Sequence, residues 1–149
     1  EYLHFPWVNE LVFPDFPVSE SGAFHFWEVK ILFYINYAAL FISGVISFFY
    51  IRHLKQINGL WRLIQPFKIA IFVPFVLLVI LAIDFDAMFV LFHEVAFNND
   101  AWIFSPVTDP IITVLPQEFF MLCFAFAFIL IEGSFIAGYF LSKRQSNSN

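Results

Sequence analysis

The chain has 149 residues and a formal net charge of −5, and 61% of its residues are apolar while only 13% are charged. Soluble domains are nearer half apolar and a quarter charged, and a water-soluble domain of this size could not bury so much apolar surface. The composition therefore excludes that class and predicts an integral membrane protein. The single cysteine, Cys123, excludes an internal disulfide and is expected to be a small packed side chain.

Residues 1–30 come first, and we expect them to lie at the outer membrane interface. Residues 1–29 contain five acidic residues and no basic one, together with several prolines and the tryptophans Trp7 and Trp27. Prolines argue against long regular elements, and tryptophans favour the membrane interface. Short interfacial helices are therefore predicted in this segment, with Lys30 at the membrane boundary.

Three apolar runs long enough to cross a bilayer follow, over residues 31–51, 67–92 and 119–141. A helix needs about 17 to 25 apolar residues to cross the hydrocarbon core. The runs show no period-two alternation, and a backbone in lipid must satisfy its own hydrogen bonds, so helices are expected rather than barrel strands. The fold class is thus predicted as an all-α integral membrane protein with three transmembrane helices, the second kinked at Pro74.

The connecting segments divide by charge. Residues 52–66 carry three basic residues and the polar tail 142–149 carries two more, whereas residues 93–118 contain acidic residues and no Lys or Arg. Short basic segments stay in the cytoplasm, so 52–66 and 142–149 are predicted inside and the two acidic segments outside. A chain that starts outside needs a preceding span, so a fourth helix is expected in the complete protein.

Two histidines in the outer segments are the main candidates for chemistry. His25 precedes the first span, with Glu28 three residues later on the same helical face and Lys30 beyond it, and His93 follows the second span. Both histidines have a similar predicted depth, so we expect them to face one shared cleft. The alternative is that each is an interfacial imidazole bonded to water. Glu94 points away from His93, because neighbouring residues on a helix diverge.

Glu132 lies midway along the third span, where a carboxylate costs a few kcal/mol unless it is neutral, paired or in a wet cavity. It is a possible intramembrane functional site. The alternative is a protonated glutamate bonded to Ser134 or to a polar residue of another helix.

Other chemistries find little support in the sequence. The histidines and the nearby glutamates have the donor types of a zinc site, but only His25 and Glu28 have helical spacing, so no metal is predicted. The chain lacks the zinc-protease, nucleophile-elbow and phosphate-loop motifs. The outer segments are acidic, so no nucleic-acid partner is predicted either.

Two stretches resemble the bacterial lipoprotein intramolecular transacylases. "GAFHFWEVK" is similar to a short His-x-x-acid-Val-Lys motif of that family, with Glu28 at a position where the family is associated with Asp. "FHEVAFNNDAWIFSPVTDPIITVLPQEFF" is similar to a longer and more specific signature. The positions that carry this second resemblance are Phe92, His93, Phe97, Asn98, Trp102, Asp109, Ile112, Pro116, Phe119 and Phe120.

The resemblance implies an acyltransferase of the bacterial cell membrane whose active site lies at the outer face. Its substrate would be a lipoprotein with a diacylglyceryl-cysteine at the N-terminus, and it would move the sn-2 acyl chain to the cysteine α-amino group. The product is the lyso-form lipoprotein, no cofactor is needed, and the protein is expected to be a monomer. The site residues carried by the resemblance are His25 and His93 as the acid–base pair, with Glu28, Lys30, Asn98, Trp102 and Asp109 in supporting or substrate-binding roles.

The residue types suit this reaction. An α-amino group has a pKa of about 7.7–8.0, and an imidazole with a pKa near 6.5 is a reasonable base for it. Which histidine is the base stays open at this point. Three rival hypotheses remain: a zinc-dependent membrane hydrolase with the same histidines, a small transporter or channel centred on Glu132, and a purely structural subunit.

Overall fold

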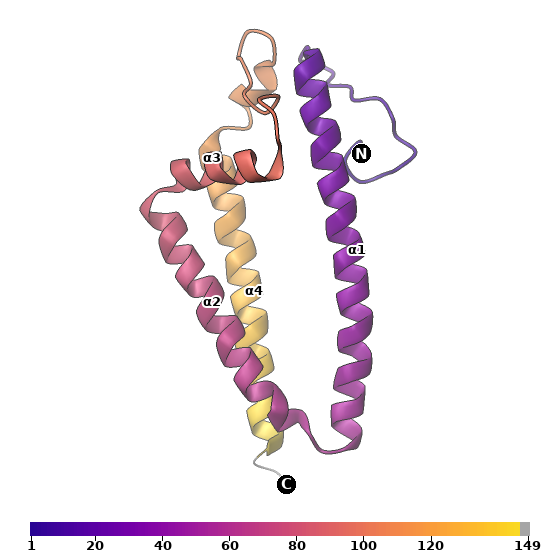
Figure 1. Cartoon of the computed structure of the whole chain (residues 1–149), viewed down its shortest axis with the longest axis vertical. Coiled ribbons are helices and arrows are strands. Elements are labelled where there is room, and N and C mark those ends of the chain that lie inside the picture. Colours follow the sequence, from indigo (N-terminus) through magenta and orange to yellow (C-terminus); the bar gives the residue numbers. More distant parts are fainter. Residues whose placement is uncertain (147–149) are drawn as a thin grey trace. The chain divides into compact units, whose positions relative to one another are not determined.

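The computed structural model describes residues 1–146, and every regular element in that range is helical (Figure 1). This confirms the predicted all-α fold class. The elements are α1 (Glu20–Gln56), η1 (Leu60–Leu63), α2 (Ile64–Ile83), α3 (Phe85–Ala96), η2 (Pro110–Thr113) and α4 (Gln117–Ser146), where η marks a 3₁₀ helix. Three stretches are long and apolar enough to cross a membrane, Glu20–Gln56, Leu60–Ile83 and Gln117–Gln145.

Burial in this chain is the reverse of that in a soluble protein. Dozens of large apolar side chains are exposed along the long helices, whereas the buried apolar residues are only Leu54, Leu60, Phe97 and Ile111 among those described. The buried set also contains five polar residues, which are His25, Lys30, Asp109, Glu132 and Ser142. Lipid acyl chains are the solvent that such a surface requires.

The helix ends differ from the predicted ones at several places. α1 begins at Glu20 rather than at residue 31, so the segment around His25 is part of the same long helix. The sequence predicts one helix over residues 67–92, whereas the structure has two, because Asp84 leaves the helical conformation at φ −151° and ψ 84°. Pro74 lies inside α2. Of the predicted polar tail 142–149, α4 includes residues through Ser146 and the rest lies outside the described residues.

The chain divides into two compact units. Unit 1 comprises residues 1–42 and 86–119, and unit 2 comprises residues 43–85 and 120 onward. In unit 1, the segment before α1 runs back beside the helix (Figure 1), because Lys30 Nζ donates to the Val8 carbonyl at 2.5 Å and His4 Nδ1 lies 2.6 Å from the Tyr37 hydroxyl. These contacts attach the acidic N-terminal segment to α1.

Within unit 2, α2 and α4 pack antiparallel through aromatic rings. Phe67 near the start of α2 lies 6.5 Å from Phe135, measured between ring centroids, whereas Phe85 just after α2 lies 6.0 Å from Phe124. Gly138 on α4 leaves room for the Phe67 ring, which a Cβ at that position would overlap. Contacts of this kind need small residues and good packing rather than polar pairing, as is usual between helices in lipid.

The turn that ends α1 also belongs to unit 2. Asn58 adopts a positive φ of 52°, a conformation that asparagine tolerates better than most residues. The Gly59 N–H then donates to the Leu54 carbonyl at 2.7 Å, which satisfies one of the free carbonyls at the helix end.

Candidate active site

The start of α1 is fixed by a hydrogen-bonded cluster in unit 1 that is centred on a buried carboxylate. Ser19 precedes the helix, and its hydroxyl oxygen accepts the Gly22 N–H at 3.0 Å, which is the contact of a helix N-cap. The Ser19 N–H and hydroxyl both donate to the carboxylate of Asp109, each at 2.8 Å, and the Thr108 hydroxyl donates to the same group at 2.7 Å. Asp109 is only 2% exposed. The carboxylate thus joins two parts of the chain that are 90 residues apart.

The surroundings of Asp109 favour its charged form. Burial by itself raises the pKa of this carboxyl, but the hydrogen bonds from the Ser19 backbone, the Thr108 hydroxyl and the Ser19 hydroxyl outweigh it, and the net pKa is lowered. Asp109 is therefore an anchor for α1 that operates as a carboxylate.

His25 lies in the second turn of α1, and its ring meets His93 of α3. The two imidazole centroids are 5.9 Å apart. His25 is only 7% exposed, with Phe97 at 4.6 Å and Phe104 at 5.6 Å, both edge-on. Burial among aromatic rings favours a neutral imidazole, the form that can accept a proton.

His93 is held in one tautomer by its own helix. Its Nδ1 lies 2.7 Å from the carbonyl oxygen of Phe89. Because a carbonyl only accepts hydrogen bonds, Nδ1 carries the hydrogen, and Nε2 of the neutral ring keeps its lone pair for proton transfer. The Trp102 ring lies 4.8 Å from the imidazole and forms a wall beside it.

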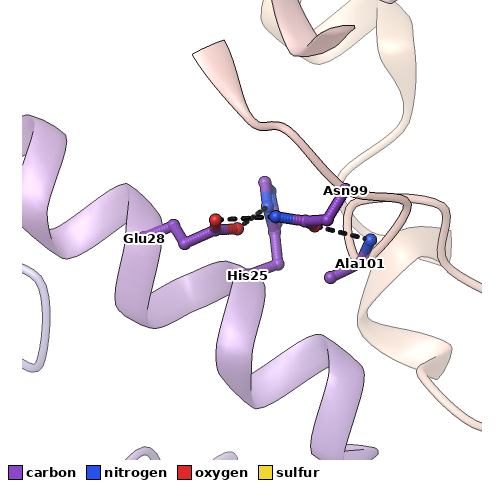
Figure 2. Close-up of polar contacts among 4 residues, drawn as sticks. All are labelled: His25, Glu28, Asn99 and Ala101. Carbon is purple, nitrogen blue, oxygen red and sulfur yellow. Dashed lines mark hydrogen bonds and ion pairs between the residues drawn. The ribbon is translucent and has the colours of Figure 1, made fainter.

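A carboxylate stands next to His25 (Figure 2). Glu28 Oε2 lies 3.9 Å from His25 Nδ1, within ion-pair distance when the imidazole is protonated. Glu28 Oε1 accepts a hydrogen bond from Asn99 Nδ2 at 2.8 Å, and Asn99 Oδ1 accepts the Ala101 N–H at 2.9 Å. A histidine, a carboxylate and an amide thus follow one another from α1 to the loop after α3.

The other predicted site residues are placed differently. Lys30 is buried, but its ammonium group contacts the Val8 carbonyl and lies over the Tyr2 ring at 4.4 Å, so it holds the N-terminal segment. Asn98 is exposed, and its neighbour Asn99 makes the contact to Glu28. Glu94 is exposed as well.

Glu132 belongs to unit 2, whereas the two histidines belong to unit 1. It is 9% exposed, and its Oε1 has no hydrogen-bond partner among the described residues. The predicted alternative of a bond to Ser134 is not seen among the described residues, where the Ser134 hydroxyl donates to the Leu130 carbonyl one turn earlier at 2.7 Å.

Two residues of the site were missed from the sequence, Ser19 and Asn99. Ser19 carries a usable signal, since serine is a preferred residue directly before a helix, but the apolar run predicts a helix that starts only at residue 31. Asn99 carries no sequence signal that distinguishes it from its neighbour Asn98. Within residues 1–146, no group of three or more His, Cys, Asp or Glu side chains has the arrangement of a metal site.

The family model described as lipoprotein intramolecular transacylase Lit matches residues 1–120. The chain belongs to this family. The resemblance first found in the two histidine motifs is thereby confirmed, and with it the assignment as an acyltransferase.

Solved structures give the same answer. The membrane-integral lipoprotein intramolecular transacylase Lit from Bacillus cereus matches with a TM-score of 0.89 and 33% identity, over 99% of this chain and 68% of that one. Two further structures of the Bacillus cereus protein, one with a histidine-to-arginine and one with a histidine-to-alanine substitution, match at 32% identity with TM-scores of 0.79, over 99% of this chain and 66% and 67% of theirs. No curated protein matched the chain.

Proposed function

We propose that this transacylase moves the sn-2 acyl chain of a diacylglyceryl-cysteine to the α-amino group of the same cysteine, with His25 and His93 as the acid–base pair. The observation that carries the proposal is the pair of imidazole rings 5.9 Å apart, one of them beside a carboxylate. Amine and ester belong to one molecule, so the attack is intramolecular, and correct positioning supplies a large part of the rate.

The reaction needs no oxidant and no second lipid. The amine nitrogen attacks the ester carbonyl carbon, the new C–N bond forms, and the bond from that carbon to the glycerol oxygen breaks. The amine loses a proton and the glycerol oxygen gains one, so the products are an amide and a free glycerol hydroxyl. No serine or cysteine nucleophile is required, because the substrate amine is itself the nucleophile.

The surroundings of the two rings suggest a division of labour. Glu28 stabilises a protonated His25, which suits His25 as the base that takes the amine proton. His93 has Nε2 available and passes a proton to the leaving glycerol oxygen from its protonated form. Proton transfer between the rings then restores both starting states.

Four further residues take supporting roles in the proposal. Trp102 forms a wall against His93, and Lys30 fastens the N-terminal segment through the Val8 carbonyl. Exposed Asn98 is available to bind the substrate headgroup. Asp109 supports the site indirectly, through the start of α1. The protein acts as a monomer and uses no cofactor.

The proposed location is the outer face of the bacterial cytoplasmic membrane. The charge distribution supports it, since residues 1–29 and 93–118 contain no Lys or Arg whereas the segments around residues 52–66 and 142–145 are basic. The ester of a membrane-anchored lipoprotein lies just below the headgroups, near the depth expected for residues adjoining the ends of the spans.

The test is mass spectrometry of a lipoprotein N-terminus after co-expression with this protein. We expect an N-acylated, singly O-acylated cysteine with the unaltered protein, and the diacylglyceryl form with a free amine when His25→Ala or His93→Ala replaces it. Absence of acyl migration with the unaltered protein would contradict the proposal.

The rival zinc hydrolase is separated by a second measurement. Acyl transfer by purified protein should continue unchanged in excess chelator, and release of free fatty acid should not accompany it. Loss of activity in chelator that zinc restores would favour the hydrolase.

A further inference from the structure

Asn99 has an orientation that its two partners determine. The Ala101 backbone N–H can only donate, so the Asn99 atom 2.9 Å from it is the amide oxygen. A carboxylate only accepts, so the amide nitrogen is the atom 2.8 Å from Glu28 Oε1 (Figure 2). The two bonds agree on one amide orientation, which leaves Asn99 no freedom to flip without losing both.

The bond from Asn99 to one carboxylate oxygen of Glu28 determines where the second oxygen lies. With Oε1 held by Asn99, Oε2 is the oxygen 3.9 Å from His25 Nδ1. It is buried and has no hydrogen-bond partner among the described residues, and the same is true of His25 Nδ1. A carboxylate oxygen facing a nitrogen across this 3.9 Å gap is arranged for a contact that forms once the imidazole is protonated.

We infer that Asn99 is a positioning residue for proton transfer at His25, acting through Glu28. Asn99 keeps the Glu28 carboxylate in the rotamer that places negative charge beside His25, so the imidazolium is stabilised when the base takes the amine proton. This inference rests on the proposed function. The groups that face His25 are Glu28 on its own helix, His93 on α3, and the uncharged rings of Phe97 and Phe104.

A purely structural role for Asn99 is the competing explanation. The Asn99–Glu28 bond joins residues 71 positions apart, so it also fastens the loop after α3 to α1. The two explanations differ in one respect. Fastening needs an amide and a carboxylate in either order, whereas positioning needs the negative charge on the α1 side, next to His25.

The first experiment measures kcat and KM of purified full-length protein with a synthetic diacylglyceryl lipopeptide. Asn99→Ala should lower kcat about 10- to 100-fold, on the scale of losing the hydrogen-bond partner that orients a metal-binding side chain. KM should be unchanged, because both polar atoms of the Asn99 amide are bonded to Glu28 and Ala101. The matched control is Asp100→Asn, an exposed acid-to-amide change in the same loop, which should leave both constants unchanged.

The second experiment exchanges the two groups. In the double variant Glu28→Gln with Asn99→Asp, the new glutamine amide donates to the new carboxylate, which still accepts the Ala101 N–H. The net charge is preserved, and the thermal midpoint should match that of the unaltered protein. The kcat should nevertheless stay as low as that of Glu28→Gln alone, because the charge has moved away from His25.

Two results would overturn the inference while leaving the proposed function intact. One is an Asn99→Ala variant with unchanged kcat, and the other is recovery of kcat in the double variant, which would leave Asn99 with a fastening role only. Failure of the unaltered protein to move the acyl chain at all would instead overturn the proposed function, and the inference with it.

Discussion

The two units satisfy their polar groups in different ways. In unit 1, buried and partly buried side chains bond across long sequence separations, as Asp109 does with Ser19 and Asn99 with Glu28. In unit 2, Ser134 and Ser142 donate to carbonyls one turn earlier in their own helix, and α2 meets α4 through phenylalanine rings. Unit 2 therefore depends on apolar composition and packing, whereas unit 1 depends on particular pairs. Single substitutions that break one of these pairs should be costly in unit 1, whereas substitutions on the exposed helix faces of unit 2 should be mild.

The largest expected effect concerns the histidine pair. His25→Ala or His93→Ala should each lower acyl transfer by about 10²- to 10⁴-fold, since that is the usual contribution of a positioned general acid or base. The comparison in unit 2 is Ile129→Leu on the exposed face of α4, which should leave the rate unchanged. Rates of the purified variants with a lipopeptide give the measurement, and a histidine variant that keeps more than a tenth of the activity would contradict the assignment.

The next effect concerns two glycines in α1. A Cβ on Gly22 would overlap the Asp109 carboxylate, so Gly22→Ala must displace the anchor of the helix and should cost about 1–3 kcal/mol. Gly44 has nothing within 4 Å of a Cβ, so Gly44→Ala should be neutral or stabilise by up to about 1 kcal/mol. Thermal unfolding in the same detergent compares them, and equal midpoints for the two variants would remove the packing argument.

A smaller effect should depend on pH. The pKa of Asp109 is lowered in the folded protein, so its carboxylate stabilises the fold above its ordinary pKa of about 3.9, and this contribution is lost as the pH falls toward the folded pKa. Asp109→Asn should cost about 1 kcal/mol at neutral pH, and the difference from the unaltered protein should shrink below about pH 4. Thermal midpoints across that range measure it; a difference that is constant with pH would contradict the carboxylate anchor.

The smallest effect is expected at Glu132. A glutamine has nearly the same shape and removes the ionisable group, so Glu132→Gln should leave both acyl transfer and the thermal midpoint unchanged within error. Loss of acyl transfer in this variant would contradict this expectation and would place Glu132 among the residues that the reaction needs.

The membrane-spanning helices could be predicted, because a long run of apolar residues indicates a helix whose surroundings are lipid rather than water. The break at Asp84 could not, since the apolar pattern continues through it on both sides and a backbone angle at one residue decides the matter. The residues His25 and His93 could be paired through their similar depth and the family resemblance. Asn99 could not be told from Asn98, because the direction of a loop side chain depends on contacts with α1 that are 71 residues away.

The N-cap at Ser19 fixes the register of the first turns of α1, and with it the direction in which His25 points. His25 is six positions after Ser19, and each residue of an α-helix adds about 100° of rotation and 1.5 Å of rise. With Ser19 fixed by Asp109, a single inserted or deleted residue between them would turn the imidazole about a quarter of the way round the helix, away from His93. The angular position of His25 on α1 is therefore set by its distance along the chain from Ser19.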